Sequence, residues 1–179
     1  ALMAMTFKKL GVPAISLTGP QAGIIAGGAF GKARIDDVKP ERVLRELEEG
    51  KIVIVAGFQG IMPNGDVATL GRGGSDATAV ALAGAMHADM CEIFTDVDGI
   101  YSADPRYVKG CRKMKEITNT EMLEMARLGA GVMQPRSVEL GMKYHIPIHV
   151  RSTFTDEEGT IIREVCTMEG KNESVRGVA

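Results

Sequence analysis

Residues 69–80 read Thr69-Leu70-Gly71-Arg72-Gly73-Gly74-Ser75-Asp76-Ala77-Thr78-Ala79-Val80, and the rest of the sequence is organised around them. The glycines of this stretch let a ligand approach the main chain closely, and Ser75 and Asp76 are residue types that cap helices. The pattern predicts a ring of backbone N–H groups at the positive end of a helix, where anions bind. Arg72 adds a planar guanidinium that matches a carboxylate or a phosphate. The alternative is a glycine loop that only turns the chain into a helix.

The composition indicates a globular domain and excludes several classes of partner. The 179 residues, 45% of them apolar, are enough for one domain, or for one domain and a piece of another. A formal net charge of −2 gives no overall attraction to nucleic acid or to an anionic membrane. Aromatic residues are only 4% of the chain, so base-stacking surfaces are not expected. We therefore expect neither nucleic-acid nor membrane partners.

Cysteine usage favours a cytoplasmic protein. The three cysteines, Cys91, Cys111 and Cys166, are widely spaced and form no CxxC pair. This pattern favours reduced thiols over a disulfide framework or a zinc site. No apolar run reaches the length of a membrane span, and no signal peptide is visible.

The two ends of the sequence resemble interior parts of a longer polypeptide. The chain begins with Ala1, and residues 1–10 carry a helical pattern with no cap before it. Residues 173–179 resemble the approach to another apolar strand. We therefore expect this chain to be a piece of a longer protein.

Hydrophobic periodicity predicts strands that alternate with helices. Helices are expected at residues 1–10, 40–49, 75–87, 119–128 and 135–144, and strands at residues 14–17, 52–56, 91–95, 146–150 and 160–162. A hairpin or irregular strands are expected at residues 24–35, and a turn between two short strands at residues 63–66. Such an alternation is typical of an α/β fold, here a layered sandwich with a mainly parallel central sheet flanked by helices.

The polar loop at residues 96–106 is the second candidate site. Asp96 or Asp98 could accept hydrogen bonds from a ribose, and Tyr101 could lie against an adenine ring. Arg106 could bind a polyphosphate. The alternative is a solvated loop, because surface loops are usually polar.

Several other kinds of site are excluded. The polar loop is not an EF-hand, because that pattern needs an oxygen ligand, a glycine and a glutamate where Ile100, Tyr101 and Tyr107 stand. Neither a GxxxxGK[ST] P-loop nor a GxGxxG turn between a strand and a helix occurs. The three histidines lack metal-ligand spacing, so we expect no metal-binding residues among them.

Three motifs resemble, in order and spacing, the catalytic domain of the aspartokinases. They are Phe58-Gln59-Gly60, the stretch at residues 69–76, and Thr95-Asp96-Val97-Asp98-Gly99-Ile100-Tyr101-Ser102-Ala103-Asp104-Pro105-Arg106. Matches at residues 17–24, 121–126 and 150–152 extend the resemblance over nearly the whole chain. The sequence is most similar to bacterial members in which paired ACT domains follow the catalytic domain. The resemblance implies a partial amino acid kinase fold at residues 1–170, and a linker and the start of an ACT region at residues 171–179.

The resemblance also implies a reaction. Members of the family use ATP to phosphorylate the side-chain carboxylate of L-aspartate, which gives 4-phospho-L-aspartate and begins the synthesis of lysine, threonine and methionine. ATP and Mg²⁺ are therefore implied, and phosphoryl transfer depends on alignment and charge neutralisation rather than on covalent chemistry by the protein. Homo- or hetero-oligomers of aspartokinase subunits are implied as well.

The resemblance assigns roles to individual residues. Arg72 would bind an aspartate carboxylate, and Asp76 would orient the catalytic groups near the transferred phosphoryl. The other substrate-binding residues would be Phe58, Gly73, Gly74 and Ser75. The nucleotide would be held by Ser75, Thr95, Asp96, Tyr101, Ser102, Ala103, Asp104, Pro105, Arg106 and Gly131. Residues 69–80 would thus form the aspartate side of a two-substrate site, and residues 96–106 the nucleotide side.

Two departures from the family pattern shape these expectations. Many members have a lysine where this chain has Gly131, which we interpret as a backbone contact to the nucleotide. The strand with the phosphate-binding lysine, the glutamate that recognises aspartate and the ACT domains are not in this sequence. We therefore expect the 179-residue chain alone to be inactive. The alternatives are a kinase of another small acid on the same fold and a non-catalytic assembly or regulatory piece.

Overall fold

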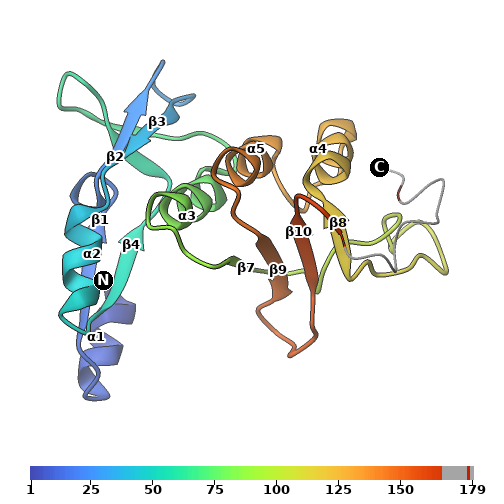
Figure 1. Cartoon of the computed structure of the whole chain (residues 1–179), viewed down its shortest axis with the longest axis horizontal. Helices are drawn as coiled ribbons and strands as arrows, with labels where there is room; N and C mark the ends of the chain where they lie inside the picture. Colours follow the sequence, from blue (N-terminus) through green and yellow to red (C-terminus); the bar gives the residue numbers. More distant parts are fainter. Residues whose placement is uncertain (167–176, 178–179) are drawn as a thin grey trace. The chain divides into compact units, whose positions relative to one another are not determined.

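The computed structural model describes residues 1–166 and residue 177. The chain divides into two compact units, residues 1–86 and residues 87–179 (Figure 1). Apart from Gly177, the linker predicted at residues 171–179 lies outside the described residues. Among the described residues, no helix combines the length and the apolar character that a membrane crossing requires.

A small parallel sheet with two helices against it forms one part of the first unit. Strand β1 (Ala14–Thr18) pairs with β4 (Ile52–Ala56) along its whole length. Helices α1 (Leu2–Lys9) and α2 (Glu41–Glu48) pack against these strands. Unbroken apolar runs such as β4 are typical of strands buried on both faces, yet its central residues are half-buried and its ends are exposed. The described part of this sheet has only two strands, so it cannot enclose β4.

Charge pairing and one apolar residue hold α2 in place. Val43 is buried, and the carboxylate of Glu46 binds Arg42 at 2.7 Å and Lys51 at 2.6 Å. Both cations lower the pKa of Glu46, with Lys51 as the larger cause. Pro40 was expected at the first helical position, but it stands one residue earlier, at the N-cap.

A mixed four-stranded sheet in the order β3-β2-β5-β6 forms the other part of the first unit. Strand β2 (Ile24–Gly27) pairs with β3 (Arg34–Val38) as an antiparallel hairpin, as predicted. Strand β5 (Gln59–Ile61) is parallel to β2 and antiparallel to β6 (Val67–Thr69). Three alanines and one leucine form the buried core of this sheet, namely Ala26, Ala33, Ala68 and Leu70.

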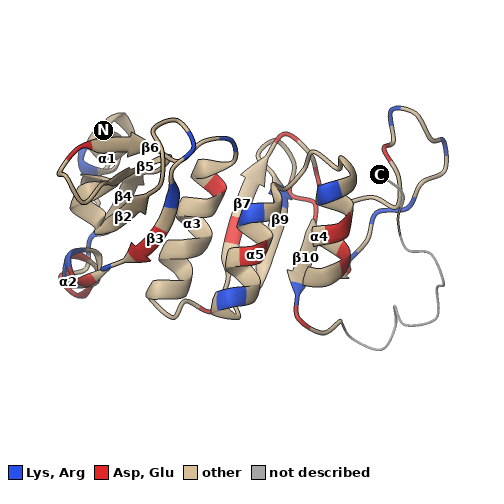
Figure 2. Cartoon of the chain, turned by 90° about the horizontal axis from the view of Figure 1, so that it is seen from above, with Lys and Arg blue, Asp and Glu red and all other residues tan. Residues whose placement is uncertain are grey.

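Helix α3 (Gly74–Ala85) follows β6 and begins at the first candidate site. Alanine and valine bury one side of it, with Ala77, Val80 and Ala81 fully enclosed. Figure 2 shows α3 almost without charge, with one acidic position in its first turn, which is Asp76. A single ionisable side chain therefore stands at the start of an otherwise apolar helix.

The second unit contains a four-stranded sheet in the order β7-β9-β10-β8. Strand β7 (Cys91–Thr95) is parallel to β9 (Ile148–Ser152), which is antiparallel to β10 (Thr160–Arg163). Strand β10 is also parallel to β8 (Glu116–Thr118). The three residues of β8 were not predicted, because a strand of this length leaves almost no periodic signal.

Two neighbouring helices cover one face of this sheet. Helix α4 (Asn119–Leu128) and helix α5 (Pro135–Tyr144) have the predicted bounds and lie on the same side of the strands (Figure 1). Thr118 caps α4 through a capping box with Glu121, which fixes where the helix begins. The predicted α/β class, with parallel strands flanked by helices, is confirmed.

Candidate functional site

Glycines, rather than Ser75 and Asp76, shape the start of α3. Gly73 is the N-cap residue with φ 69°, and Gly71 has φ 72°, both in the left-handed region that favours glycine. No side chain caps the helix. The prediction that Ser75 or Asp76 caps α3 is therefore wrong. The left-handed turn at Gly73 begins the helix at Gly74, one residue before the predicted start, which places both side chains inside the first turn.

Backbone donors are available in this first turn. The N–H of Gly74 donates to the Gly71 carbonyl at 3.0 Å, and the N–H of Ala77 donates to the Gly73 carbonyl at 3.0 Å. Within the described residues, the N–H groups of Ser75 and Asp76 have no backbone acceptor. Unpaired N–H groups at a helix N-terminus carry partial positive charge, so they can bind an anion.

Arg72 lies beside these donors and is exposed. Its guanidinium has no hydrogen-bond or ion-pair partner among residues 1–166 and 177. A guanidinium that no protein carboxylate occupies remains able to bind a carboxylate or a phosphate with two parallel hydrogen bonds. The loop at residues 71–76 therefore offers an arginine and free amides together, as the sequence predicted for an anion site.

Phe58 is held over this loop in a strained backbone conformation. Its φ is 68°, which is uncommon for a residue with a side chain. Its N–H donates to Thr78 Oγ1 at 3.2 Å, and its carbonyl accepts from Leu70 N at 3.0 Å. The ring lies so close to Gly74 that a Cβ added there would stand 2.8 Å from Phe58 Cδ2. A glycine is therefore required at residue 74 for the aromatic ring to cover the start of α3.

Thr78 links the Phe58 turn to α3. Its hydroxyl donates to the Gly74 carbonyl at 2.7 Å while it accepts from Phe58, and the residue is buried. The link to Phe58 was not predicted, because Thr78 and Phe58 are 20 residues apart. A threonine inside a helix does often bond to the carbonyl four residues earlier, which was the only local signal.

The Thr78 link leads to a stability prediction. Thr78→Val keeps the shape of the side chain but leaves the Phe58 N–H without its acceptor, so urea unfolding should show a loss of about 1–3 kcal/mol. Thr6→Val is a matched control, because Thr6 makes the same backbone bond, to the Leu2 carbonyl at 3.1 Å, on an exposed helix. The control should stay within about 0.5 kcal/mol of the wild type. Equal losses in the two variants would contradict the role of Thr78.

Asp76 is a half-buried carboxylate in the first turn of α3. Burial raises its pKa above the ordinary value, and a hydrogen bond from Ser75 opposes this shift. None of the ion pairs found among the described residues includes Asp76. A carboxylate with a raised pKa beside free backbone donors and an unpaired arginine is a candidate for a chemical role.

A second loop supports the same region of the first unit. Residues 18–23, which include the short helix η1 (Pro20–Ala22), pack against Gln59 at the start of β5. A Cβ added to Gly19 would collide with the backbone carbonyl of Gln59. This close approach fixes the position of the residue next to Phe58, and it explains the glycine in the turn.

Six of the predicted nucleotide-binding residues, Tyr101 to Arg106, lie on an irregular hairpin of the second unit. Residues 100–102 run antiparallel to residues 112–114, with Ser102 N donating to the Arg112 carbonyl at 2.9 Å and Met114 N donating to the Ile100 carbonyl at 2.8 Å. We call residues 100–114 the 100–114 hairpin. Its connecting segment, residues 103–111, includes Ala103, Asp104, Pro105 and Arg106.

The hairpin tip carries an internal ion pair. The guanidinium of Arg106 donates to both carboxylate oxygens of Asp104, at 2.7–3.1 Å, and its side chain is 80% exposed. Arg106 lowers the pKa of Asp104. Arg106 therefore binds a neighbouring carboxylate in this structure, and a polyphosphate would compete with Asp104 for it.

The two candidate ribose acceptors, Asp96 and Asp98, differ in how many hydrogen bonds they already accept. Asp98 accepts from the Tyr101 hydroxyl at 3.0 and 3.1 Å and from Lys113 Nζ at 2.9 Å. Asp96 is exposed and accepts only from Thr95 Oγ1, at 3.2 Å, among the described residues. Asp96 therefore remains available to a ribose, whereas the oxygens of Asp98 are occupied.

Gly131 lies in the turn between α4 and α5, and it is exposed. No hydrogen bond among the described residues joins it to residues 95–106. An added Cβ would meet no atom within 4 Å, and its φ is not in the left-handed region. The backbone therefore does not require glycine at this position, so the lysine of other family members would fit there.

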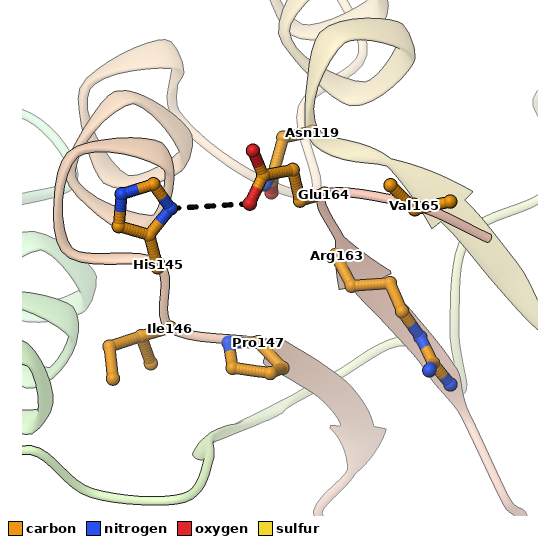
Figure 3. A pocket seen from close by; sticks show the side chains of 7 residues that line it. All are labelled: Asn119, His145, Ile146, Pro147, Arg163, Glu164 and Val165. Atoms are coloured by element: carbon orange, nitrogen blue, oxygen red, sulfur yellow. Dashed lines mark hydrogen bonds and ion pairs between the residues drawn. The ribbon is translucent and has the colours of Figure 1, made fainter.

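A pocket in the second unit involves other residues. It has a volume of about 240 Å³ and lies between the end of α5 and the end of β10 (Figure 3). Two of its lining side chains form a polar contact, with His145 Nδ1 and Glu164 Oε2 3.2 Å apart. The lining residues are Asn119, His145, Ile146, Pro147, Arg163, Glu164 and Val165, and none is a predicted site residue.

The described residues contain no group of three or more His, Cys, Asp or Glu side chains placed to hold a metal ion. Magnesium in phosphoryl-transfer sites keeps several waters and takes one or two carboxylates in addition to substrate phosphates. Asp76 in the first unit and Asp96 in the second each lack an ion-pair partner among these residues, so each carboxylate by itself could serve as such a ligand.

Comparisons with known proteins point to one family. The model of the amino acid kinase family matches residues 1–152. An aspartokinase of Bacillus sp. strain MGA3 is 55% identical over the 179 residues of this chain, which spans 43% of the length of that relative. The crystal structure of E. coli aspartokinase III in complex with aspartate and ADP superposes with a TM-score of 0.85 at 34% identity, over 93% of this chain and 38% of that one. The crystal structure of aspartate kinase from Synechocystis superposes with a TM-score of 0.77 at 44% identity, over 99% of this chain and 28% of that one.

Proposed function

Because this chain belongs to the amino acid kinase family, we propose that the whole protein transfers the γ-phosphoryl group of ATP to the side-chain carboxylate of L-aspartate. The products are ADP and the acyl phosphate 4-phospho-L-aspartate. The observation that carries the proposal is the exposed, unpaired Arg72 beside the free amides of Ser75 and Asp76. The similarity to E. coli aspartokinase III, whose structure contains aspartate and ADP, supports aspartate as the acid.

The first unit supplies the aspartate-binding residues in this proposal. Arg72 binds a carboxylate of the substrate, and Phe58, Gly73, Gly74 and Ser75 surround it. Asp76 orients the reacting groups, which is where an enzyme gains most in phosphoryl transfer. The strained Phe58 turn and the tight packing at Gly74 support a preformed site, because such geometry is kept only where the surrounding structure holds it.

The second unit supplies the nucleotide-binding residues. Thr95 and Asp96 bind the ribose, the 100–114 hairpin holds the base and phosphates through Tyr101 and residues 102–106, and Gly131 contributes a backbone contact. Bound Mg²⁺ would neutralise phosphate charge. The proposal includes the place of the reaction at the start of lysine, threonine and methionine synthesis in the cytoplasm, and assembly into homo- or hetero-oligomers of aspartokinase subunits.

A panel of acceptors tests the proposal. The whole protein with Mg-ATP should release ADP with L-aspartate at least about 100-fold faster than with L-glutamate, N-acetyl-L-glutamate or no acceptor, since a site that binds both ends of a substrate rejects mismatched lengths. Hydroxylamine should trap the acyl phosphate as a hydroxamate that mass spectrometry identifies. Faster turnover of another acid would assign the protein to that substrate. No ADP release with any acid would favour a non-catalytic assembly piece.

The 179-residue chain alone should be inactive in the same assay, because it spans 43% of the length of the Bacillus relative. ADP release by the isolated chain that depends on aspartate would contradict this part of the proposal.

A further inference from the structure

Lys113 lies on the second arm of the 100–114 hairpin and contacts groups from three parts of the second unit. Its ammonium donates to Asp98 Oδ2 at 2.9 Å and to Glu157 Oε2, in the segment between β9 and β10, at 3.0 Å. Its backbone pairs with Tyr101 across the hairpin. A Cβ added to Gly99 would stand 3.1 Å from Lys113 Cδ, so the aliphatic part of the lysine packs on the Gly99 backbone.

A second anchor lies on the same side of the hairpin. The buried Thr160 of β10 accepts from Ile100 N at 2.8 Å and donates to the Met114 carbonyl at 2.6 Å. Both hairpin strands are therefore tied to β10 through one hydroxyl. Lys113 complements this anchor because it ties the segment before the hairpin, at Asp98, to the segment before β10, at Glu157.

The positive charge of Lys113 neutralises the carboxylates of Asp98 and Glu157. Asp98 also accepts from the Tyr101 hydroxyl, so the carboxylate, the phenol and the ammonium form one network. The two carboxylates, Asp98 first, raise the pKa of Lys113 to about 12, so it stays charged in any ordinary assay. Without the ammonium, Asp98 and Glu157 would lose their common partner, and the carboxylate that holds the Tyr101 hydroxyl would lose its counter-charge.

We propose that Lys113 is a positioning residue for nucleotide binding, which acts by fixing the 100–114 hairpin through Asp98 and Glu157. This inference rests on the proposed function, in which the hairpin binds ATP. Lys113 touches no substrate in this arrangement. It sets the conformation of Tyr101 and of the backbone that follows, and loss of the tether should therefore weaken nucleotide binding more than aspartate binding.

The test uses the whole protein with Lys113→Met, which keeps the long apolar stem and removes the charge. We expect the Kd of Mg-ATP from calorimetry and the KM of ATP to rise about tenfold, while the KM of aspartate changes less than about twofold. Lys113→Arg should restore most of the affinity. Lys115→Met is the matched control, since Lys115 is exposed and has no side-chain partner among residues 1–166 and 177, and it should behave as wild type.

Hydrogen exchange provides a readout that does not depend on catalysis. The amides of Ser102 and Met114, which bond across the hairpin, should exchange faster in Lys113→Met than in wild type, while amides of β7 and β9 should not change. Unchanged exchange, or faster exchange with unchanged Mg-ATP affinity, would overturn the inference. Failure of the proposed function itself would be visible in the wild type, as absence of Mg-ATP binding or of aspartate phosphorylation.

Discussion

Arg72→Ala should raise the KM of the whole protein for aspartate by about 10- to 100-fold and change the KM for ATP by less than about twofold. A hydrogen bond to a charged group contributes about 1.5–3 kcal/mol, and each 1.4 kcal/mol is a factor of ten. The guanidinium is exposed and unpaired among the described residues, so its removal breaks no contact within the folded chain. The change therefore acts on the ligand rather than on stability.

Two further variants sharpen the Arg72 prediction. Arg72→Lys keeps the charge but loses the two parallel donors, so it should recover only part of the affinity. Arg34→Ala removes an exposed arginine of the same unit, on β3, and should leave both KM values unchanged. Equal losses of aspartate and ATP affinity in Arg72→Ala, measured by separate titrations, would contradict the proposal that this arginine binds the aspartate carboxylate.

Asp76→Asn should lower kcat by at least about 100-fold, because misalignment of the reacting groups by about 1 Å already costs that much. The amide keeps the shape of the carboxylate and removes its charge. If the ionised form is the active one, the kcat of the wild type should fall as the pH drops through the raised pKa of Asp76. The acid limb of the pH profile should be absent from the residual activity of the variant. A kcat of Asp76→Asn within threefold of wild type would show that Asp76 does not orient the reacting groups.

The same substitution should stabilise the fold at neutral pH. Burial raises the pKa of Asp76 in the folded state above its ordinary value of 3.8, so the folded state binds more protons than the unfolded state between these two values. Stability from this group is therefore present at low pH and is lost as the pH rises through the folded pKa. Asp76→Asn should have a higher Tm than wild type at pH 7, and the difference should shrink toward pH 3.8. A lower Tm at pH 7 would show that the ionised carboxylate is stabilised by the fold.

Local sequence patterns sufficed for most elements of secondary structure. The amphipathic run after Pro40, the capping residue Thr118 and the stop at Gly129 each lie within one turn of the helix end that they specify. The apolar runs of β4 and β7 gave the bounds of these strands. The anion-binding character of the Arg72 loop could also be predicted, because its glycines, its arginine and the helix that follows are adjacent in sequence.

The supports of both candidate sites could not be predicted, because their partners are far apart in the chain. Thr78 contacts Phe58 across 20 residues, Lys113 contacts Glu157 across 44, and Thr160 contacts Ile100 across 60. No periodicity in a local window contains such pairs. The helix start at Gly73 was missed for a different reason, because side-chain capping types stood next to a glycine whose left-handed φ took over the role.

The tie between Thr160 and the 100–114 hairpin also sets an order of events during synthesis. A nascent chain that has reached residue 159 already contains residues 95–106, but it lacks the hydroxyl that joins Ile100 N to the Met114 carbonyl. Strand β7 likewise cannot form its parallel pairing until β9 has been synthesised. The 100–114 hairpin, which carries most of the proposed nucleotide contacts, can therefore take its final form only after the ribosome has added β10. Translation that stops before Thr160 yields a chain in which this hairpin lacks its hydrogen bonds to the sheet.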